Sequence, residues 1–97
     1  MASERLYIVT YDISAPSRWR RVFRIMNGYG EWLQLSVFQC RLTARRHQEM
    51  LARLEKAMHG RDDHVLVIDI GDADKVETRI ESLGKTWKKL ERRALII

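Results

Sequence analysis

Apolar residues recur along this chain with two periods, one typical of strands and one typical of helices. Apolar or alternating runs predict strands over residues 6–12, 32–42, 64–70 and 79–83. Apolar stripes with i, i+3, i+4, i+7 spacing predict two amphipathic helices between these strands. The stripe residues are Trp19, Val22, Phe23 and Met26 in the first helix, and Met50, Leu51, Leu54, Ala57 and Met58 in the second.

Capping and breaking residues predict where the two helices begin and end. Pro16 favours the first turn of the first helix, with Ser14 or Ser17 as its N-cap. The segment 27–30, which contains two glycines, is expected to end that helix. Thr43 is the predicted N-cap of the second helix.

The order of these elements predicts a single α/β domain, a ferredoxin-like βαββαβ sandwich that covers the whole chain, 1–97. The strands at 6–12 and 64–70 are apolar on both faces, so we expect them to form the central pair of the sheet. A short helical turn near residues 75–77 is expected to precede the more exposed strand at 79–83. No internal repeat or linker divides the sequence.

The C-terminal tail, residues 85–97, combines a basic segment with an aliphatic end. Basic residues predominate up to Arg93, and the last four residues are aliphatic. Such an apolar, β-prone end is expected to add to a sheet edge, in its own subunit or in a partner subunit. A frayed terminus is the alternative.

Composition and charge favour a folded, basic protein with a polyanionic partner. Hydrophobic residues make up 45% of the chain and charged residues 32%, and the formal net charge is +5. A merely soluble basic protein would share this charge, so charge alone does not establish the partner. Cys40 is the single cysteine, which fits a reducing compartment. With neither a signal-peptide pattern nor an apolar run of about 20 residues, we expect a cytoplasmic protein without a membrane span.

A carboxylate ends the first predicted strand. Asp12 follows a largely apolar run, and Arg18, Arg20, Arg21 and Arg24 follow it closely. A hard oxygen ligand beside a cationic helix suits a divalent metal next to a phosphodiester. One carboxylate is too few for a magnesium site, and a symmetric dimer is one source of a second. The alternative is a structural role, in which Asp12 caps the helix that follows.

The arginines of the first helix form a one-sided charge set. Positions 15–24 contain four arginines and no acidic residue, whereas a solvated helix face usually mixes both signs. We therefore expect these arginines to contact phosphates, with an ordinary solvated face as the alternative. A second basic set, for which contact and solvation are equally open, comprises Arg41, Arg45, Arg46 and Arg53.

Three other features have ordinary structural explanations. Seven acidic and three basic residues lie between Arg61 and Ser82, and we expect a solvated turn region there. The three histidines are too scattered in sequence for a zinc site. Ser36 and Phe38 share one face of a predicted strand, where an aromatic ring is more often part of the core than a platform for a stacked base.

Four segments carry a more specific pattern. They are residues 7–14, 18–22, 29–30 and 34–40, with Tyr-Asp-Ile at 11–13 and Ser-Val-Phe at 36–38. Together they resemble the small CRISPR-associated adaptation nuclease family, which partners the CRISPR integrase during spacer acquisition. The resemblance extends over nearly the whole chain.

The resemblance implies a ferredoxin-like homodimer in which an additional C-terminal strand crosses to the partner's sheet. It implies that Asp12 meets its symmetry mate across the two-fold axis and binds Mg²⁺ or Mn²⁺ for phosphodiester cleavage, which leaves a 5′-phosphate and a 3′-hydroxyl. RNA and double-stranded DNA are both implied as substrates. The residues implied to hold phosphates or to line the cleft are Arg18, Arg20, Arg21, Ser36 and Phe38.

Two functions stay open at this point. In the first, the protein is a metal-dependent endonuclease with Asp12 as its catalytic and metal-binding residue. In the second, it is a non-catalytic, DNA-binding bridge of the integrase complex. Some family members carry a basic residue shortly before the Gln-x-Ser-Val-Phe stretch, where this chain has Trp32 and Leu33. That departure weakens the case for cleavage more than the case for binding. Without the resemblance, a ferredoxin-like regulatory or RNA-binding module would be a third function.

Overall fold

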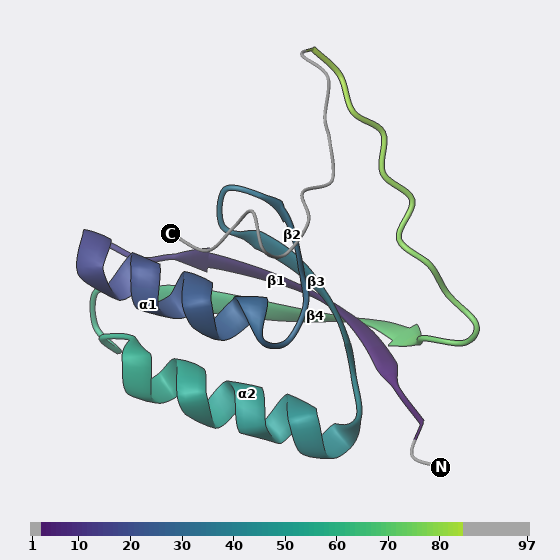
Figure 1. Cartoon of the computed structure of the whole chain (residues 1–97), viewed down its shortest axis with the longest axis horizontal. Coiled ribbons are helices and arrows are strands. Elements are labelled where there is room, and N and C mark those ends of the chain that lie inside the picture. Colours follow the sequence, from purple (N-terminus) through teal and green to yellow (C-terminus); the bar gives the residue numbers. More distant parts are fainter. Residues whose placement is uncertain (1–2, 85–97) are drawn as a thin grey trace.

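The described residues, 3–84 of a computed structural model, form four strands and two helices in the order strand-helix-strand-strand-helix-strand (Figure 1). Both helices cover the same face of the sheet, so the domain has two layers. The elements in chain order are β1 (Arg5–Asp12), α1 (Pro16–Asn27), β2 (Glu31–Gln34), β3 (Val37–Leu42), α2 (Ala44–Ala57) and β4 (His64–Asp72).

The sheet has the strand order β2-β3-β1-β4, and every neighbouring pair is antiparallel. This order, with both helices on one face, is that of the ferredoxin-like βαββαβ sandwich, so the predicted fold class is confirmed. β1 lies between β3 and β4 and is therefore held by hydrogen bonds on both edges. Its last residue, Asp12, lies beyond the last β1–β3 pair, Thr10 with Val37, and pairs with β4 alone.

The core fills the space between the helices and one face of the sheet. Val9, Val22, Met26, Phe38 and Met50 are all fully buried there. The predicted helical stripes supply the helix side of this core, as their 3.6-residue period requires, except for Met58, which is the half-buried C-cap of α2 and lies outside the core cluster.

The opposite face of the sheet, here called the open face, is not covered by any described element. Side chains alternate across a strand, so residues paired with Ile8 and Thr10 on this face include Leu66 and Ile68 of β4. These two side chains are 48% and 45% exposed. An exposed apolar sheet face of this kind is typical of an interaction surface.

The segment 32–42, predicted as one strand, is two strands joined by a tight turn at Leu35 and Ser36. Leu35 has a positive φ of 40°, and Trp32 Nε1 donates a hydrogen bond of 2.9 Å to its carbonyl oxygen. The prediction was wrong because this turn contains no glycine or proline, the residues that normally mark a hairpin.

Because the hairpin was not predicted, the strand at 64–70 was wrongly expected to be the second central strand of the sheet. β1 and β3 are central, whereas β4, the predicted strand at 64–70, is an edge strand of the described sheet. Residues 79–83 form no strand among the described residues, although residues 80–83 line a pocket together with Leu33, Gln34 and Val37 of the β2–β3 hairpin. Residues 73–75 form a turn, not the start of a helix. The predicted tail, 85–97, lies outside the described residues.

The predicted caps were right for one helix and wrong for the other. Thr43 Oγ1 accepts a hydrogen bond of 3.3 Å from Arg46 N, as expected of the N-cap of α2. The N-cap of α1 is Ala15, and no side chain caps that helix. Ser14 is instead bound to Asp63, an acceptor 49 residues away.

Gly30 allows the chain to enter β2 against the neighbouring strand. A Cβ atom at this position would clash with the carbonyl oxygen of Gln39 and with Cys40 Sγ. No side chain other than hydrogen fits there without backbone movement.

Within residues 3–84, no helix has the length and apolar character needed to cross a bilayer.

Candidate nucleic-acid and metal site

Asp12 is the exposed last residue of β1. The side chains of Tyr7, Val9 and Tyr11 point into the core, so the alternation of the strand places Asp12 with Ile8 on the open face. The carboxylate therefore lies at a strand end, free of the helix layer and accessible from solvent. The predicted position of Asp12 at the end of a central strand is confirmed, and its role as a metal ligand stays a prediction.

His64 is the cross-strand neighbour of Asp12. It is the exposed first residue of β4, and antiparallel partners have Cβ atoms about 4.5–5.5 Å apart on the same face of the sheet. The sequence interpretation set the histidines aside as scattered. Only the β1–β4 register brings this imidazole beside the carboxylate, so no local sequence signal could have identified it.

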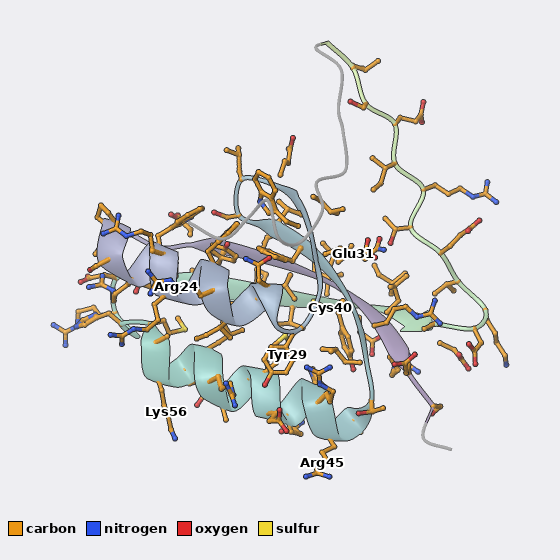
Figure 2. The ribbon with its side chains drawn as sticks, viewed as in Figure 1. Arg24, Tyr29, Glu31, Cys40, Arg45 and Lys56 are labelled. Atoms are coloured by element: carbon orange, nitrogen blue, oxygen red, sulfur yellow. The ribbon has the colours of Figure 1, made fainter. Side chains whose placement is uncertain are left out.

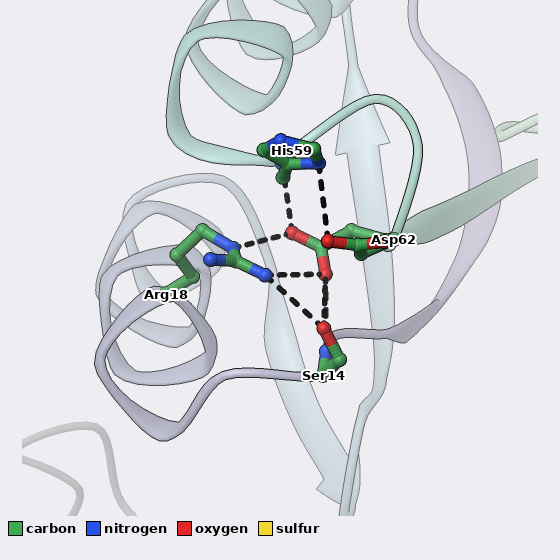
Figure 3. A network of polar contacts seen from close by, with 5 residues as sticks. Ser14, Arg18, His59 and Asp62 are labelled. Atoms are coloured by element: carbon green, nitrogen blue, oxygen red, sulfur yellow. Dashed lines mark hydrogen bonds and ion pairs between the residues drawn. The ribbon is translucent and has the colours of Figure 1, made fainter.

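A buried carboxylate lies directly before His64 in the chain. Asp63 accepts hydrogen bonds from Ser14 N at 3.0 Å, from Arg18 Nε at 2.7 Å and from His59 N at 2.8 Å (Figure 3). Ser14 Oγ and Arg18 Nη2 also lie within hydrogen-bond distance of its Oδ1, at 3.2 Å each. These four residues, Ser14, Arg18, His59 and Asp63, are called the Asp63 cluster below.

The cluster keeps Asp63 ionised. The hydrogen bond from Arg18 is the main cause that holds the pKa of this carboxyl well below its ordinary value, and the backbone amides of His59 and Ser14 add to it against the cost of burial. The same bond raises the pKa of Arg18. The prediction that the acidic residues of segment 61–82 are solvated is therefore wrong for Asp63, whose side chain is 0% exposed. It is right for its neighbour Asp62, which is exposed.

The structure separates Arg18 from the other arginines of α1. Arg18 is engaged with Asp63, whereas Arg20, Arg21 and Arg24 are exposed. Among residues 3–84, no acidic side chain forms an ion pair with these three. Their guanidinium groups are accessible from solvent, and contact with phosphates stays a prediction for them.

The basic surface continues from α1 onto α2. Arg21 lines a shallow depression together with Arg53 and Lys56, and its remaining lining residues are apolar. Figure 2 shows Lys56 and Arg45 projecting away from the helix layer. The predicted second basic set thus contributes at least Arg53 to a surface shared with the first.

Ser36 and Phe38 have different environments although they lie close in sequence. The Ser36 carbonyl accepts Tyr11 N at 3.1 Å, and its hydroxyl accepts Trp19 Nε1 at 2.8 Å, so it lies beside the end of β1. Phe38 is 0% exposed and contacts the ring of Phe23 at a centroid distance of 5.5 Å. The expectation that Phe38 lines a cleft is wrong, because its ring fills the core, and the core interpretation is confirmed.

The donor atoms at Asp12 fit a hard divalent cation only in part. Over the described part of the chain, no group of three or more histidine, cysteine or acidic side chains is close enough to hold a metal alone. Mg²⁺, however, usually binds one or two carboxylates and takes its other ligands from water and substrate phosphates. One exposed carboxylate at Asp12 satisfies that requirement, and a second copy of the chain would satisfy it more fully.

Comparison with known proteins places the chain in a family. The sequence pattern of the family described as CRISPR associated protein Cas2 matches residues 5–78. The chain belongs to the Cas2 family. The CRISPR-associated endoribonuclease Cas2 1 of Rhodospirillum rubrum is 52% identical over 95 residues, which cover 98% of this chain and 93% of that protein. The CRISPR-associated endoribonuclease Cas2 of Geobacter sulfurreducens is 48% identical, and the match covers 97% and 99% of the two chains.

Solved structures of the Cas2 family have the same fold. A crystal structure of Cas2 superimposes with a TM-score of 0.76 at 27% identity, covering 92% of this chain and 97% of the other. Streptococcus pyogenes Cas2, crystallised at pH 6.5, gives a TM-score of 0.65 at 28% identity over 76% of this chain and 98% of its own. The resemblance noted in the sequence is therefore confirmed.

Proposed function

We propose that this Cas2-family protein is a divalent-metal-dependent phosphodiester endonuclease of the CRISPR adaptation machinery. In this proposal it acts on RNA or double-stranded DNA, as a homodimer that works with the CRISPR integrase. The observation that carries the proposal is the exposed carboxylate of Asp12 at the end of the central strand. Support also comes from the names of its relatives, which are called endoribonucleases.

Asp12 would hold Mg²⁺ or Mn²⁺, and Asp12 of the partner subunit would complete the carboxylate pair. When bound, such an ion polarises the phosphodiester and lowers the pKa of a water molecule. The exposed Arg20, Arg21 and Arg24 bind and orient the phosphate backbone and offset its negative charge. His64, the cross-strand neighbour of Asp12, would exchange a proton with water or with the leaving oxygen. The products would carry a 5′-phosphate and a 3′-hydroxyl.

The open face of the sheet supports a dimer. Leu66, Ile68 and Ile70 are between 40% and 48% exposed on β4. Pairing two such faces would remove apolar surface from water. Because Asp12 borders the same face, a two-fold axis there would bring two copies of the carboxylate toward one another.

A metal-titrated cleavage assay tests the proposal. Purified protein is incubated with RNA and with duplex DNA over a range of Mg²⁺, beside Asp12→Ala and the control Asp74→Ala, an exposed acid at the other end of the domain. We expect cleavage to require Mg²⁺, to be lost by about 100-fold or more in Asp12→Ala and to be unchanged in the control. Equal cleavage in excess chelator, or full activity of Asp12→Ala, would refute the proposal.

A second function, a non-catalytic DNA-binding bridge of the integrase complex, is favoured by one observation. The exposed arginines of α1 and the depression lined by Arg21, Arg53 and Lys56 form a basic surface that does not depend on Asp12. This function predicts that duplex binding weakens steeply with salt and that spacer acquisition survives Asp12→Ala. Loss of acquisition in that variant, with dimer and complex intact, would count against it.

A further inference from the structure

We propose that Asp63 is a positioning residue for the site at Asp12, and that Arg18 is its ionic partner and not a phosphate ligand. The role in catalysis rests on the proposed function, whereas the structural role does not. The proposal changes the expected function of Arg18, which the sequence groups with the other arginines of α1.

The Asp63 cluster joins the two chain segments that carry Asp12 and His64. The β1–β4 ladder ends at the pair Asp12 and His64. Ser14 lies two residues beyond the first of these, and Asp63 directly precedes the second. The carboxylate of Asp63 accepts both the amide and the hydroxyl of Ser14, at 3.0 and 3.2 Å. A side chain therefore continues the connection between the two strands past the last ladder pair and restrains both residues of the site.

The cluster also determines where α1 begins. Arg18 lies in the first turn of this helix, and its Nε and Nη2 reach both oxygens of Asp63, at 2.7 and 3.2 Å. Nη2 additionally donates to Ser14 Oγ at 3.1 Å. Since α1 carries Arg20 and Arg21, the position of these phosphate-binding candidates relative to Asp12 depends on the same carboxylate.

A third segment is fixed by the same carboxylate. His59 N, at the end of the α2 region, donates to Asp63 Oδ2 at 2.8 Å. The Asp63 side chain, which is excluded from solvent, thus joins three segments: helix α1, the segment after α2 and the β1–α1 loop. Networks in which a buried charge is fully hydrogen-bonded are rigid and specify a single geometry.

Most of the hydrogen-bonding capacity of Arg18 is used within this network. Removing the guanidinium would leave the buried Asp63 carboxylate without its counter-charge, which is strongly unfavourable. Two of the three nitrogens of the guanidinium group already donate to the cluster. The exposed Arg20 and Arg21 carry no such cost, so phosphate binding falls to them.

The catalytic part of the proposal is tested with Asp63→Asn, which keeps the shape and removes the charge. Asp62→Asn is the matched control, since it removes an exposed acid from the adjacent position. We expect the kcat for Mg²⁺-dependent cleavage to fall about 10- to 100-fold in Asp63→Asn, with KM within about twofold, because misplaced groups slow the reaction more than they weaken binding. The control keeps wild-type kinetics. A wild-type kcat in folded Asp63→Asn would overturn the positioning role.

The role of Arg18 is tested by the salt dependence of binding to a duplex. The slope of log K against log[salt] is negative, and each phosphate contact that is lost reduces its magnitude by about 1. We expect this change in Arg20→Ala and an unchanged slope in Arg18→Ala. A double variant, Asp63→Asn with Arg18→Gln, should have a kcat no lower than either single variant, because both act through one network. An equal reduction in the magnitude of the slope by Arg18→Ala and Arg20→Ala would overturn the assignment.

Hydrogen exchange separates failure of this proposal from failure of the proposed function. The amide of Ser14 is a donor to Asp63, so its exchange should accelerate about tenfold or more in Asp63→Asn and not in Asp62→Asn. If the wild type shows no cleavage but Ser14 responds in this way, the proposed function fails and the structural role of Asp63 stands. Unchanged exchange of Ser14 in Asp63→Asn would overturn the structural role itself.

Discussion

The two ends of the β1–β4 region each carry an arginine–aspartate pair, and the two pairs differ mainly in burial. Arg5 and Asp69 lie 2.9 Å apart with side chains 51% and 46% exposed. Arg18 and Asp63 lie 2.7 Å apart, and the carboxylate is 0% exposed. The first pair links two neighbouring strands, whereas the second links a loop, a helix and the segment after another helix. The end of the sheet that carries Asp12 is therefore the more rigidly constructed end.

The presence of opposite charges alone does not decide how much an ion pair contributes to stability. An exposed pair gains little, because water and salt screen it and its side chains lose freedom. A buried pair is costly to break on one side, since the remaining charge has no compensation. We infer that the Asp63 pair determines local structure at the candidate site and that the Arg5 pair is nearly neutral.

The largest expected effect is on thermal stability. Asp63→Asn should lower the Tm by about 10 °C or more, whereas Asp69→Asn should lower it by about 2 °C or less, as surface pairs usually do. Differential scanning calorimetry of the two variants beside the wild type measures both shifts. Equal shifts would show that burial does not distinguish the two ends.

The next effect is on the accessibility of Cys40, which is buried in the core (Figure 2) and lies in register with Tyr7, the residue that also pairs with Asp69. Burial raises the pKa of its thiol to about 12, so a thiol reagent should label it at pH 8 only when the structure opens. We expect Asp63→Asn to label about tenfold or more faster than the wild type, and Asp69→Asn to label at nearly the wild-type rate. Fast labelling of the native wild type would contradict the closed core.

A smaller effect is expected on the pH dependence of stability. Because the folded pKa of Asp63 is lowered, its ionised form favours folding above the ordinary carboxyl pKa, and this contribution is lost as the pH falls through the folded pKa. The Tm difference between wild type and Asp63→Asn should stay constant above about pH 5 and shrink below about pH 4. A difference that grows on acidification would have the wrong sign for this account.

The smallest expected effect is that of salt on the Tm difference between variant and wild type, and it is expected only for the Arg5–Asp69 pair. Raising NaCl from about 0.05 to about 1 M shortens the Debye length several-fold and screens exposed charges. The small Tm difference caused by Asp69→Asn should vanish, and the difference caused by Asp63→Asn should persist. Loss of both differences in high salt would place the Asp63 pair among ordinary surface pairs.

Local sequence patterns predicted most of the fold because they report local physics. The period of apolar residues gave both helices and the strand ending at Asp12, and Thr43 marked the start of α2. The turn at Leu35 and Ser36 was missed because it is stabilised by a bond from Trp32 and not by a glycine. The exposed segment at 79–83 alternates like a strand but has no partner strand among the described residues.

The candidate site was predicted less completely than the fold because its parts come from distant segments. Asp12 and the exposed arginines of α1 were identifiable from their own neighbourhood in sequence. Asp63 lies in an acidic segment that is elsewhere solvated, and its partner Arg18 is 45 residues away. His64 adjoins Asp12 only through the register of β1 and β4. Burial and pairing of such residues are properties of the tertiary structure.

The most direct test of the metal site is anomalous diffraction from crystals grown with Mn²⁺, with Asp12→Ala crystals as the control. We expect a peak at metal–oxygen bonding distance from the Asp12 carboxylate, about 2.1 Å, located on the two-fold axis of a dimer and absent in the variant. A peak bound elsewhere, or two copies of Asp12 on opposite sides of the assembly, would contradict it.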